Sequence, residues 1–430
     1  MTWAHEAFSR VGAMALALAL ASAVAYGADW PQFQGPNRDG YSPETGLARS
    51  WPENGPKELW SVSVGPGYAG PAVRDGEVYF LDRVDEKQDI VRCLDLNTGH
   101  ENWRYAYDAP GSTGHSGSRT TPTVDADYVY TVGLMGDFLC VDRTTHQPLW
   151  HKNVLEGYGV DTPKWGASQS PFLHGTMVIV APQAEDAFVV AYDRKSGETI
   201  WASSGLGGVG YSTPVVATLC GVDQVVMVSA SDGGDEGRVA GLSAADGTIL
   251  WAYRGWQCKI PIPYAMPLPE DRLFVTGGYG AGSVMLQIRR SGEAFEIVER
   301  YRLGAEVCGS QIHQPVFYNG HLYLNSNSNE REDGMTCLTL DGNVLWRTKE
   351  VKEWPTFERG NLLLAGNMII ALDGKRGTLC LVDPSPEGYK EITRASVLKG
   401  TKMWSPMALS DGRLLVRNQE EMKCLDLRAP

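Results

Sequence analysis

Short stretches that alternate apolar and polar residues recur along this chain, separated by turns rich in Gly, Asp, Asn and Ser. A period of two places successive side chains on opposite faces, which is typical of a β-strand with one buried face. Apolar patterns with a helical period of 3.6 are scarce. The pattern therefore predicts an all-β fold built from many short strands.

One phrase closes each group of strands: an apolar residue, usually Asp, a short turn, Gly, and a Trp about four residues later. It occurs as CLDLNTGHENW (Cys93–Trp103), AYDRKSGETIW (Ala191–Trp201) and GLSAADGTILW (Gly241–Trp251), with weaker copies CVDRTTHQPLW (Cys140–Trp150) and CLTLDGNVLW (Cys337–Trp346). From Trp60 onward the Trp positions are spaced by 43, 47, 51 and 50 residues; Tyr301 takes the next slot, and Trp346 follows. A period of ~45 residues is typical of one four-stranded blade of a β-propeller.

A second phrase opens each unit: a small or polar residue, Pro, and then an alternating strand. Its prolines are Pro71, Pro122, Pro171, Pro214, Pro267, Pro315 and Pro406, and Asn361 takes the slot in the one unit without Pro. Proline cannot donate to a strand ladder and suits the start or edge of a sheet, so we expect each to open an innermost strand. Counting these openings predicts eight blades of four antiparallel strands.

The eighth unit ends at Leu427, where the turn to its outer strand is due. A strand with the missing pattern, residues 57–62, lies at the other end of the propeller region. We expect this N-terminal strand to complete the C-terminal blade, because ring closure removes exposed sheet edges. The propeller then spans residues 57–430. Residues 26–56 are rich in Pro and Gly and contain Trp30, Phe33 and Trp51, which favour an ordered arm packed on the propeller over a flexible linker.

Residues 11–25 form an apolar run that ends in Ala23-Val24-Ala25, an A-x-A cleavage pattern. We expect residues 1–25 to be a signal peptide and the mature protein to be exported to the periplasm or beyond. Only Arg10 is positive before this run, so a misplaced start site is the alternative. No Cys precedes Cys93, and no later stretch is apolar for 18 residues, so neither a lipid anchor nor a membrane span is expected.

The formal net charge of −13 disfavours nucleic acid and anionic lipid as partners. The eight cysteines do not form a disulfide framework in the predicted fold. Five of them occupy one repeat position on different blades, too far apart to pair, and are expected to be small buried side chains: Cys93, Cys140, Cys337, Cys380 and Cys424. Cys258 and Cys308 are out of phase with the repeat, and whether they pair stays open.

The D-x-x-T/S-G-x-x-x-W phrase resembles the repeat of pyrroloquinoline-quinone (PQQ) dehydrogenases and of the outer-membrane protein assembly factor propeller. The opening Trp30-Pro31-Gln32-Phe33-x-Gly35-Pro36-Asn37-Arg38-Asp39-Gly40 resembles the start of exported PQQ-like propeller proteins common in planctomycete-type bacteria. The resemblance covers nearly everything after the leader. It implies the propeller fold strongly and the function weakly, because propellers serve many unrelated functions.

In a propeller of this kind, the loops from each outer strand to the next inner strand surround one mouth of the central channel. Residues in these loops that break the repeat symmetry are the candidates for binding a ligand or partner in this funnel, because residues common to all repeats serve the fold. They are Arg119, Gln169, Tyr211, His313, Glu358, Arg359 and Trp404. The alternative is that they seal neighbouring blades together.

Three functions remain open. The first is a monomeric, non-catalytic binding or scaffold propeller, possibly in cell-envelope assembly, with a protein, small molecule or glycan as partner and no cofactor. The second, implied by the resemblance, is a PQQ-dependent dehydrogenase of alcohols or sugars with Ca²⁺; Glu358 would then serve as base or ligand, and Arg119 or Arg359 would face the quinone. The vicinal Cys pair of quinoprotein alcohol dehydrogenases and a C-x-x-C-H haem motif are absent from the sequence. The third is a polysaccharide-binding module.

Overall fold

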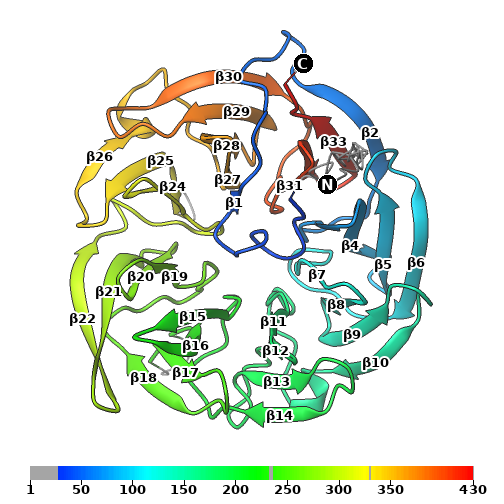
Figure 1. The fold of residues 1–430 in the computed structure, drawn as a ribbon, viewed down its shortest axis with the longest axis vertical. Helices are drawn as coiled ribbons and strands as arrows, with labels where there is room; N and C mark the ends of the chain where they lie inside the picture. The colour runs from blue at the N-terminus through cyan, green and yellow to red at the C-terminus, as the bar shows by residue number, and fades with distance from the viewer. Residues whose placement is uncertain (1–27, 232–235, 329–330, 430) are drawn as a thin grey trace, which may run out of the picture.

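Thirty-two strands form eight four-stranded blades around a ring in this computed structural model, which describes residues 28–231, 236–328 and 331–429 (Figure 1). The first four blades are β3(Ala72–Arg74), β4(Glu77–Val84), β5(Gln88–Asp95) and β6(Glu101–Asp108); β7(Thr123–Val124), β8(Tyr128–Val132), β9(Asp137–Asp142) and β10(Pro148–Asn153); β11(Phe172–His174), β12(Met177–Val180), β13(Val190–Asp193) and β14(Thr199–Ala202); and β15(Val215–Leu219), β16(Val222–Val228), β17(Val239–Ser243) and β18(Ile249–Tyr253).

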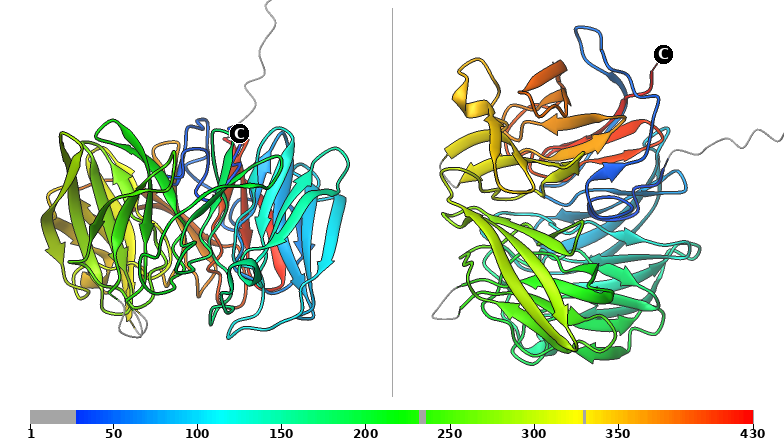
Figure 2. Two further views of the ribbon diagram at one scale, coloured as in Figure 1. Left: turned by 90° about the horizontal axis from the view of Figure 1, so that it is seen from below. Right: turned by 60° about the vertical axis from the view of Figure 1, so that its left-hand side comes forward.

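The remaining blades follow the same antiparallel order from the channel outward. They are β19(Met266–Leu268), β20(Arg272–Gly277), β21(Gly282–Ser291) and β22(Ala294–Leu303); β23(Val316–Tyr318), β24(His321–Ser328), β25(Arg331–Thr339) and β26(Val344–Arg347); β27(Leu362–Ala365), β28(Met368–Leu372), β29(Thr378–Asp383) and β30(Lys390–Ser396); and β31(Ala408–Ser410), β32(Arg413–Arg417), β33(Glu421–Asp426) and β2(Lys57–Ser63). Two 3₁₀ turns, η1(Glu156–Tyr158) and η2(Thr348–Glu350), are the helical segments of the described residues. Figure 2 shows the ring from the side, with its strands running through its thickness.

The eighth blade confirms the predicted ring closure. β2 pairs antiparallel with β33 along its length, from Lys57 opposite Asp426 to Ser63 opposite Glu421. This strand is the first of the propeller in sequence, yet it is the outermost strand of the last blade. Closure therefore joins the two ends of the propeller by main-chain hydrogen bonds and leaves no incomplete blade.

The prolines lie where the repeat predicts them, at the start of the innermost strands. Pro71, Pro122 and Pro171, for example, directly precede β3, β7 and β11. Pro267 differs, because it is the middle residue of β19, opposite Leu273. An innermost strand has one free edge, so the missing N–H of a proline costs no ladder bond there.

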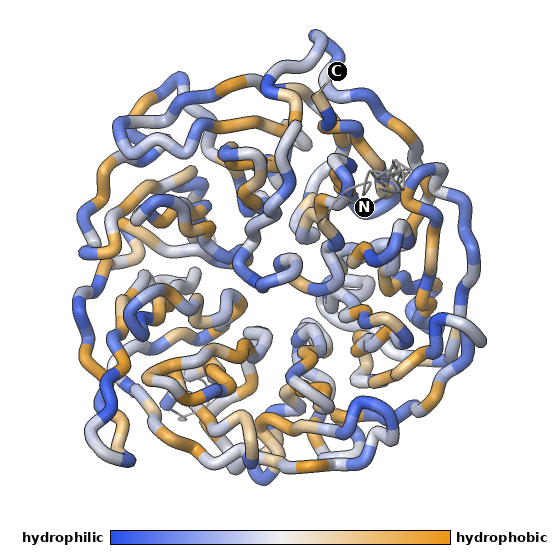
Figure 3. Tube along the Cα trace, viewed as in Figure 1, coloured by the Kyte–Doolittle hydropathy of each residue, from blue (hydrophilic) through white to orange (hydrophobic). Residues whose placement is uncertain are grey.

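The hydrophobic core lies between neighbouring blades, and its clusters combine residues of adjacent blades. Hydrophobic positions recur along the strands of every blade (Figure 3). The five cysteines at the repeat position all lie on third strands, where they are buried and unpaired, as predicted. Cys258 and Cys308 are also buried and unpaired. Burial raises the pKa of the Cys140 thiol to about 12, so it stays a neutral, inert thiol.

Residues 28–56 run across the centre of the ring (dark blue in Figure 1) and contact several blades. Trp30 is buried, and its main chain exchanges two hydrogen bonds with Val73 of β3, at 3.0 and 2.8 Å. Farther along, β1(Tyr41–Ser42) pairs in parallel with β27, so the seventh blade has five strands rather than the predicted four. Main-chain hydrogen bonds to the first, second and seventh blades, and to Leu427 after the eighth, hold this segment in place. The leader expected at residues 1–25 lies outside the described residues.

Phe33 and Arg38 connect this segment to two further blades. The Phe33 ring meets the edge of Tyr264, with ring centroids 6.2 Å apart. The Arg38 guanidinium lies 3.7 Å from the centre of the Phe172 ring and donates to the Pro171 carbonyl at 3.0 Å. Because these contacts reach the third and fifth blades, the segment crosses the channel and closes it from one side.

Candidate functional site

A cavity of about 250 Å³ lies at the mouth of the channel, bounded by loops that lead from one blade to the next. It is lined by Phe33, Tyr68, His115, Arg119, Trp165, Ser168, Ser170, Tyr211, Thr213, Ile262, Tyr279, Gln311, Ile312, His313, Arg359, Trp404 and Pro406. We call it the funnel cavity. Eight of these side chains are aromatic rings or imidazoles, and neither Asp nor Glu is among the described residues that line it.

Two aromatic rings and two guanidinium groups form a stacked column along one wall. Tyr68 and Trp404 stack with centroids 5.6 Å apart and planes 20° apart. The Arg119 guanidinium carbon lies 5.0 Å from the centre of the Tyr68 ring, and that of Arg359 lies 5.2 Å from Trp404. Cation–π contacts of this kind hold both guanidinium groups against the rings, where they are partly shielded from water.

Another part of the wall is formed by Trp165 and Tyr211, whose ring centroids are 5.1 Å apart. The main-chain N–H of Tyr211 donates to the Pro261 carbonyl at 2.9 Å, which ties this loop to the next blade. Gln169 lies behind the wall: its amide donates to the Gly210 carbonyl at 2.9 Å, and the side chain is buried. Gln169 therefore supports the wall and does not line the cavity.

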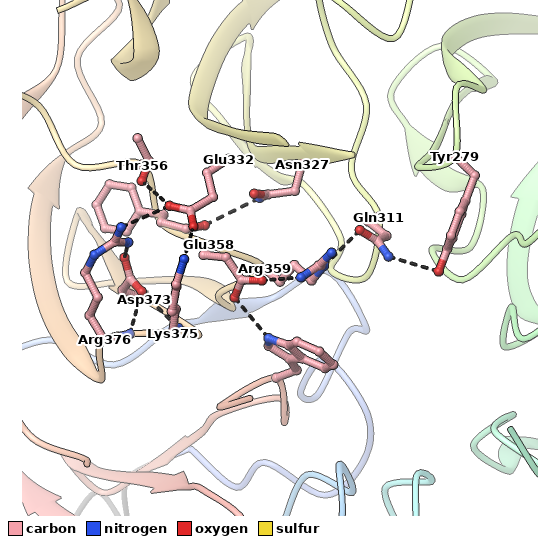
Figure 4. Close-up of polar contacts among 12 residues, drawn as sticks. Tyr279, Gln311, Asn327, Glu332, Thr356, Glu358, Arg359, Asp373, Lys375 and Arg376 are labelled. Atoms are coloured by element: carbon pink, nitrogen blue, oxygen red, sulfur yellow. Dashed lines mark hydrogen bonds and ion pairs between the residues drawn. The ribbon is translucent and has the colours of Figure 1, made fainter. Parts of the chain in front are cut away.

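Glu358 does not line the cavity but connects two residues that do, Trp404 and Arg359, and its contact with Arg359 is drawn in Figure 4. One carboxylate oxygen pairs with the Arg359 guanidinium, and the other accepts the Trp404 indole N–H at 3.1 Å. Arg359 Nε also donates to Gln311 at 2.9 Å, and the Gln311 amide donates to the Tyr279 hydroxyl at 2.9 Å. The chain of contacts runs from the fifth blade to the loop before the eighth and fixes the orientation of each side chain in it.

His313 is a buried imidazole of the cavity wall. Its Nδ1 lies 3.3 Å from the Asn361 amide nitrogen, and its Nε2 is buried without a hydrogen-bond partner among the described residues. Burial lowers the pKa of His313 to about 4, against the opposing influence of the Arg359 and Trp404 main chain. The imidazole is therefore neutral at physiological pH, a polar but uncharged part of the wall.

Asn361 explains why one unit departs from the opening proline. Its side-chain oxygen accepts the main-chain N–H of Met407 at 3.0 Å, and its amide nitrogen faces His313. Proline has no side chain that could make either contact. At this position the repeat residue is replaced by one that connects the loop before the sixth blade with the loop before the eighth.

The structure brings five of the seven predicted residues together in one cavity: Arg119, Tyr211, His313, Arg359 and Trp404. Gln169 and Glu358 lie behind it, holding a wall loop and a pair of lining side chains. Phe33, His115, Tyr279 and Gln311 were not predicted. His115 lies four residues before Arg119 in the same loop, so a search of the whole loop would have found it; Phe33 is placed by the arm, which carries no repeat signal.

A quinone enzyme would need a cation held by carboxylate and amide oxygens, with a carboxylate base beside it. The funnel cavity has no lining carboxylate among the described residues, and both oxygens of nearby Glu358 are engaged by Arg359 and Trp404. Within the described ranges, no group of three or more His, Cys, Asp or Glu side chains could hold a metal ion. The residues present do not fit the cation of a quinone enzyme.

A second cavity, of about 320 Å³, is lined by the seventh blade and by the loop that leads to it from the sixth. Residues 353–357 form one side of it, and Arg359 of the same loop lines the funnel cavity. Glu332 accepts hydrogen bonds from Thr356 at 2.8 Å and Lys375 at 2.7 Å (Figure 4), and its carboxylate, despite partial burial, has a pKa lowered to about 2 by these contacts and by Arg376. These ion pairs and the hydrogen bond from Thr356 hold the loop at residues 353–357 in place.

Solved structures with the same fold include two dehydrogenases and one assembly factor. A quinohemoprotein alcohol dehydrogenase from Comamonas testosteroni has a TM-score of 0.63 at 14% identity, covering 94% of this chain and 81% of its own. A europium-containing methanol dehydrogenase has a TM-score of 0.66 at 14% identity, covering 90% and 89%. BamB from Moraxella catarrhalis has a TM-score of 0.60 at 13% identity, covering 86% of this chain and 99% of its own. At these identities the likeness shows the fold alone.

A curated relative and a family model add sequence evidence. The serine/threonine-protein kinase AfsK of Streptomyces griseus is 29% identical over 162 residues, which are 36% of this chain and only 18% of that protein. The model of the outer membrane protein assembly factor BamB family matches residues 88–203 and 235–404, about two thirds of the chain. Together with the eight closed blades, this match shows that the chain belongs to the family of PQQ-like repeat propellers described as outer membrane protein assembly factor BamB.

Proposed function

We propose that this chain is a non-catalytic binding or scaffold propeller of the cell envelope, and that the funnel cavity is its binding surface. The observation that carries the proposal is the convergence of five symmetry-breaking side chains, from separate loops, on one aromatic cavity. Aromatic walls with a few fixed polar groups are the usual composition of a ligand site. The family match and the likeness to BamB support a binding role.

Recognition in this proposal combines stacking and charge. Trp165 offers a ring face, the stacked rings of Tyr68 and Trp404 add apolar surface, and Arg119 and Arg359 favour an anionic or carbonyl group on the ligand. A neutral sugar is a poorer fit, because Gln311, the one side-chain amide among the described residues that line the cavity, is already bonded to Tyr279 and Arg359. This observation favours a small molecule or a protein segment over a polysaccharide.

Export remains part of the proposal. Among the described residues, no helix is long and apolar enough to cross a membrane. From the expected leader at residues 1–25, we propose that the protein works in the periplasm or outside the cell, as a monomer. Sequencing of the mature N-terminus from the native host tests the leader; retention of Met1 would contradict it.

The test of the binding surface compares two tryptophans with similar surroundings. Trp404 stacks on Tyr68 in the funnel cavity, and Trp354 packs on Tyr389 in the second cavity, with centroids 5.5 Å apart. Wild-type protein and the Trp404→Leu and Trp354→Leu variants are incubated with an envelope extract of the host, and bound molecules and proteins are identified by mass spectrometry. We expect wild type and Trp354→Leu to retain the same ligand or partner and Trp404→Leu to lose it.

Folding is checked in the same preparations. Trp404 loses a ring contact and the bond to Glu358, so Trp404→Leu should cost somewhat more than the ~0.5 kcal/mol of an ordinary surface substitution, yet leave the cooperative unfolding transition intact. Trp404→Phe keeps a ring in place and serves if Trp404→Leu does not fold. Retention of the ligand by both Trp404 variants would show that the funnel is not the binding surface.

A further inference from the structure

The two arginines of the funnel cavity have different partners. Arg359 is paired with the Glu358 carboxylate and also donates to Gln311. Arg119 donates to two main-chain carbonyls, those of Trp165 and His115, the latter at 2.5 Å. Within the described residues Arg119 forms no ion pair. These two acceptors of Arg119 are neutral carbonyls, whereas the charge of Arg359 is balanced by the Glu358 carboxylate.

Arg119 also has donors left for a ligand. A guanidinium group carries five N–H donors in a planar fork, and the two carbonyls use two of them. Arg119 lines the funnel cavity, so the remaining donors are within reach of a molecule bound there. Planar donors of this kind match the two oxygens of a carboxylate or similar anion.

The surroundings of Arg119 are locally positive in a protein whose net charge is −13. His115 lies beside Tyr68, with ring centroids 6.1 Å apart. The pKa of His115 is lowered by burial and by the charges of Lys402 and Arg119. Since none of the described residues lining the cavity is Asp or Glu, no carboxylate offsets this field inside it.

We infer that Arg119 is the residue that binds the anionic group of the ligand, with a flat monoanion as the simplest ligand that satisfies the site. Glu358 is a positioning residue: its carboxylate pairs with Arg359 and accepts the Trp404 indole N–H. Arg119 is then the cation that distinguishes an anionic ligand from a neutral one. This inference rests on the proposed function and makes it more specific. It assigns different roles to two arginines that the sequence presents as equivalent.

A matched pair of probes isolates the charge. Benzoate and benzamide have the same flat ring, and only benzoate is an anion. Binding to the full chain is followed by NMR through the His115 imidazole and the Trp404 indole N–H. We expect benzoate to bind wild type more tightly than benzamide, and the pKa of His115 to rise when benzoate is bound, because an anion offsets the repulsion from Arg119 and Lys402.

Substitutions then separate the two arginines. Arg119→Gln should weaken benzoate binding by about tenfold or more and leave benzamide unchanged, whereas Arg359→Gln should weaken benzoate by less than about threefold. Arg119→Lys keeps the charge and should retain most of the affinity, and it serves if Arg119→Gln does not fold. Without any ligand, Arg119→Gln should raise the pKa of His115, since one of the repelling charges is gone.

The role of Glu358 predicts a rescue that a merely structural residue would not give. Glu358→Gln keeps an acceptor for the Trp404 N–H but releases the Arg359 charge. Combined with Arg119→Gln, it should therefore restore benzoate affinity by about threefold or more over Arg119→Gln alone, with the Trp404 indole resonance unshifted. Glu358→Ala should shift that resonance.

Equal loss of benzoate in Arg119→Gln and Arg359→Gln, equal affinity of wild type for both probes, or the absence of any benzoate binding would each overturn the inference. None of these results decides the proposed function, which is tested with host extract and the Trp404 variants. If Trp404→Leu loses the native ligand and one of these three results is also obtained, the funnel cavity is still the binding surface, but Arg119 does not have the role inferred for it.

Discussion

The repeat phrase encodes a contact between neighbouring blades. Asp95 accepts the main-chain N–H groups of the two residues that start the turn to the outer strand, and Gly99 ends this turn with φ of 71°. A Cβ on Gly99 would lie 2.7 Å from the Trp60 ring of the preceding blade, whose indole donates to the Leu96 carbonyl at 2.8 Å. The glycine and the tryptophan of the phrase are thus partners across a blade boundary.

The same contact recurs between Gly197 and Trp150 and between Gly247 and Trp201. In the weaker copy His146 takes the Gly slot at φ of 60° and stacks on Trp103, with centroids 4.9 Å apart. The structure confirms that the repeat Trp residues lie on outer strands, and Trp103, Trp201, Trp251 and Trp346 are buried while Trp150 is half-buried. Their recurrence is explained by packing.

Gly247→Ala tests this contact against a matched glycine. Gly247 has φ of 75°, and a Cβ would lie 2.5 Å from Trp201; Gly221 has φ of 74°, with nothing within 4 Å. Gly221→Ala should cost about 1–2 kcal/mol of unfolding free energy from backbone strain alone. Gly247→Ala should cost about 1–3 kcal/mol more, because the methyl group displaces the Trp201 ring. Equal costs in urea unfolding would show that the Trp contact contributes nothing.

At the level of strands, the molecule depends on β2 for closure and on the arm for Phe33, which lines the funnel cavity. Two truncated chains separate these contributions. A chain that begins at Lys57 lacks the arm and keeps β2, whereas one that begins at Val64 lacks both. Without β2, the eighth blade exposes β33 and loses the Trp60 contact to the first blade.

We expect the chain that begins at Val64 to unfold over a broad transition at a markedly lower temperature than the chain that begins at Lys57, because an open ring exposes the core at both ends. Calorimetry of the two chains measures the difference. If both unfold at the same temperature, pairing of β2 with β33 does not hold the ring together. Removal of the arm alone should instead remove Phe33 from the funnel cavity and weaken ligand binding.

For the whole molecule, the sequence predicted the fold more fully than the site. Blade number, strand order and closure follow from repeated positions, such as the opening prolines and Trp60, which can be compared with one another along a single chain. Site residues have no such internal comparison. Arg119, His313 and Trp404 were found because they break the repeat, but Phe33 and Tyr279 reach the cavity through long-range placement of an arm and a loop, which no local pattern records.

The same difference explains the roles of Glu358 and Gln169. Both break the repeat, as binding residues would, yet their side chains are buried and bonded to neighbouring loops. Sequence shows that such a position is special, and only the contacts show whether it faces a ligand or holds the residues that do. In a repeat protein, residues that support a site and residues that contact its ligand can both depart from the repeat pattern.

The central claim is that the funnel cavity binds a ligand or partner. The most direct test is an experimental structure of the protein purified from its own host without added ligands. We predict density in the cavity against Trp404, with an anionic group on Arg119. A funnel cavity that contains only ordered water, in protein that retains its native partner elsewhere on its surface, would contradict the claim.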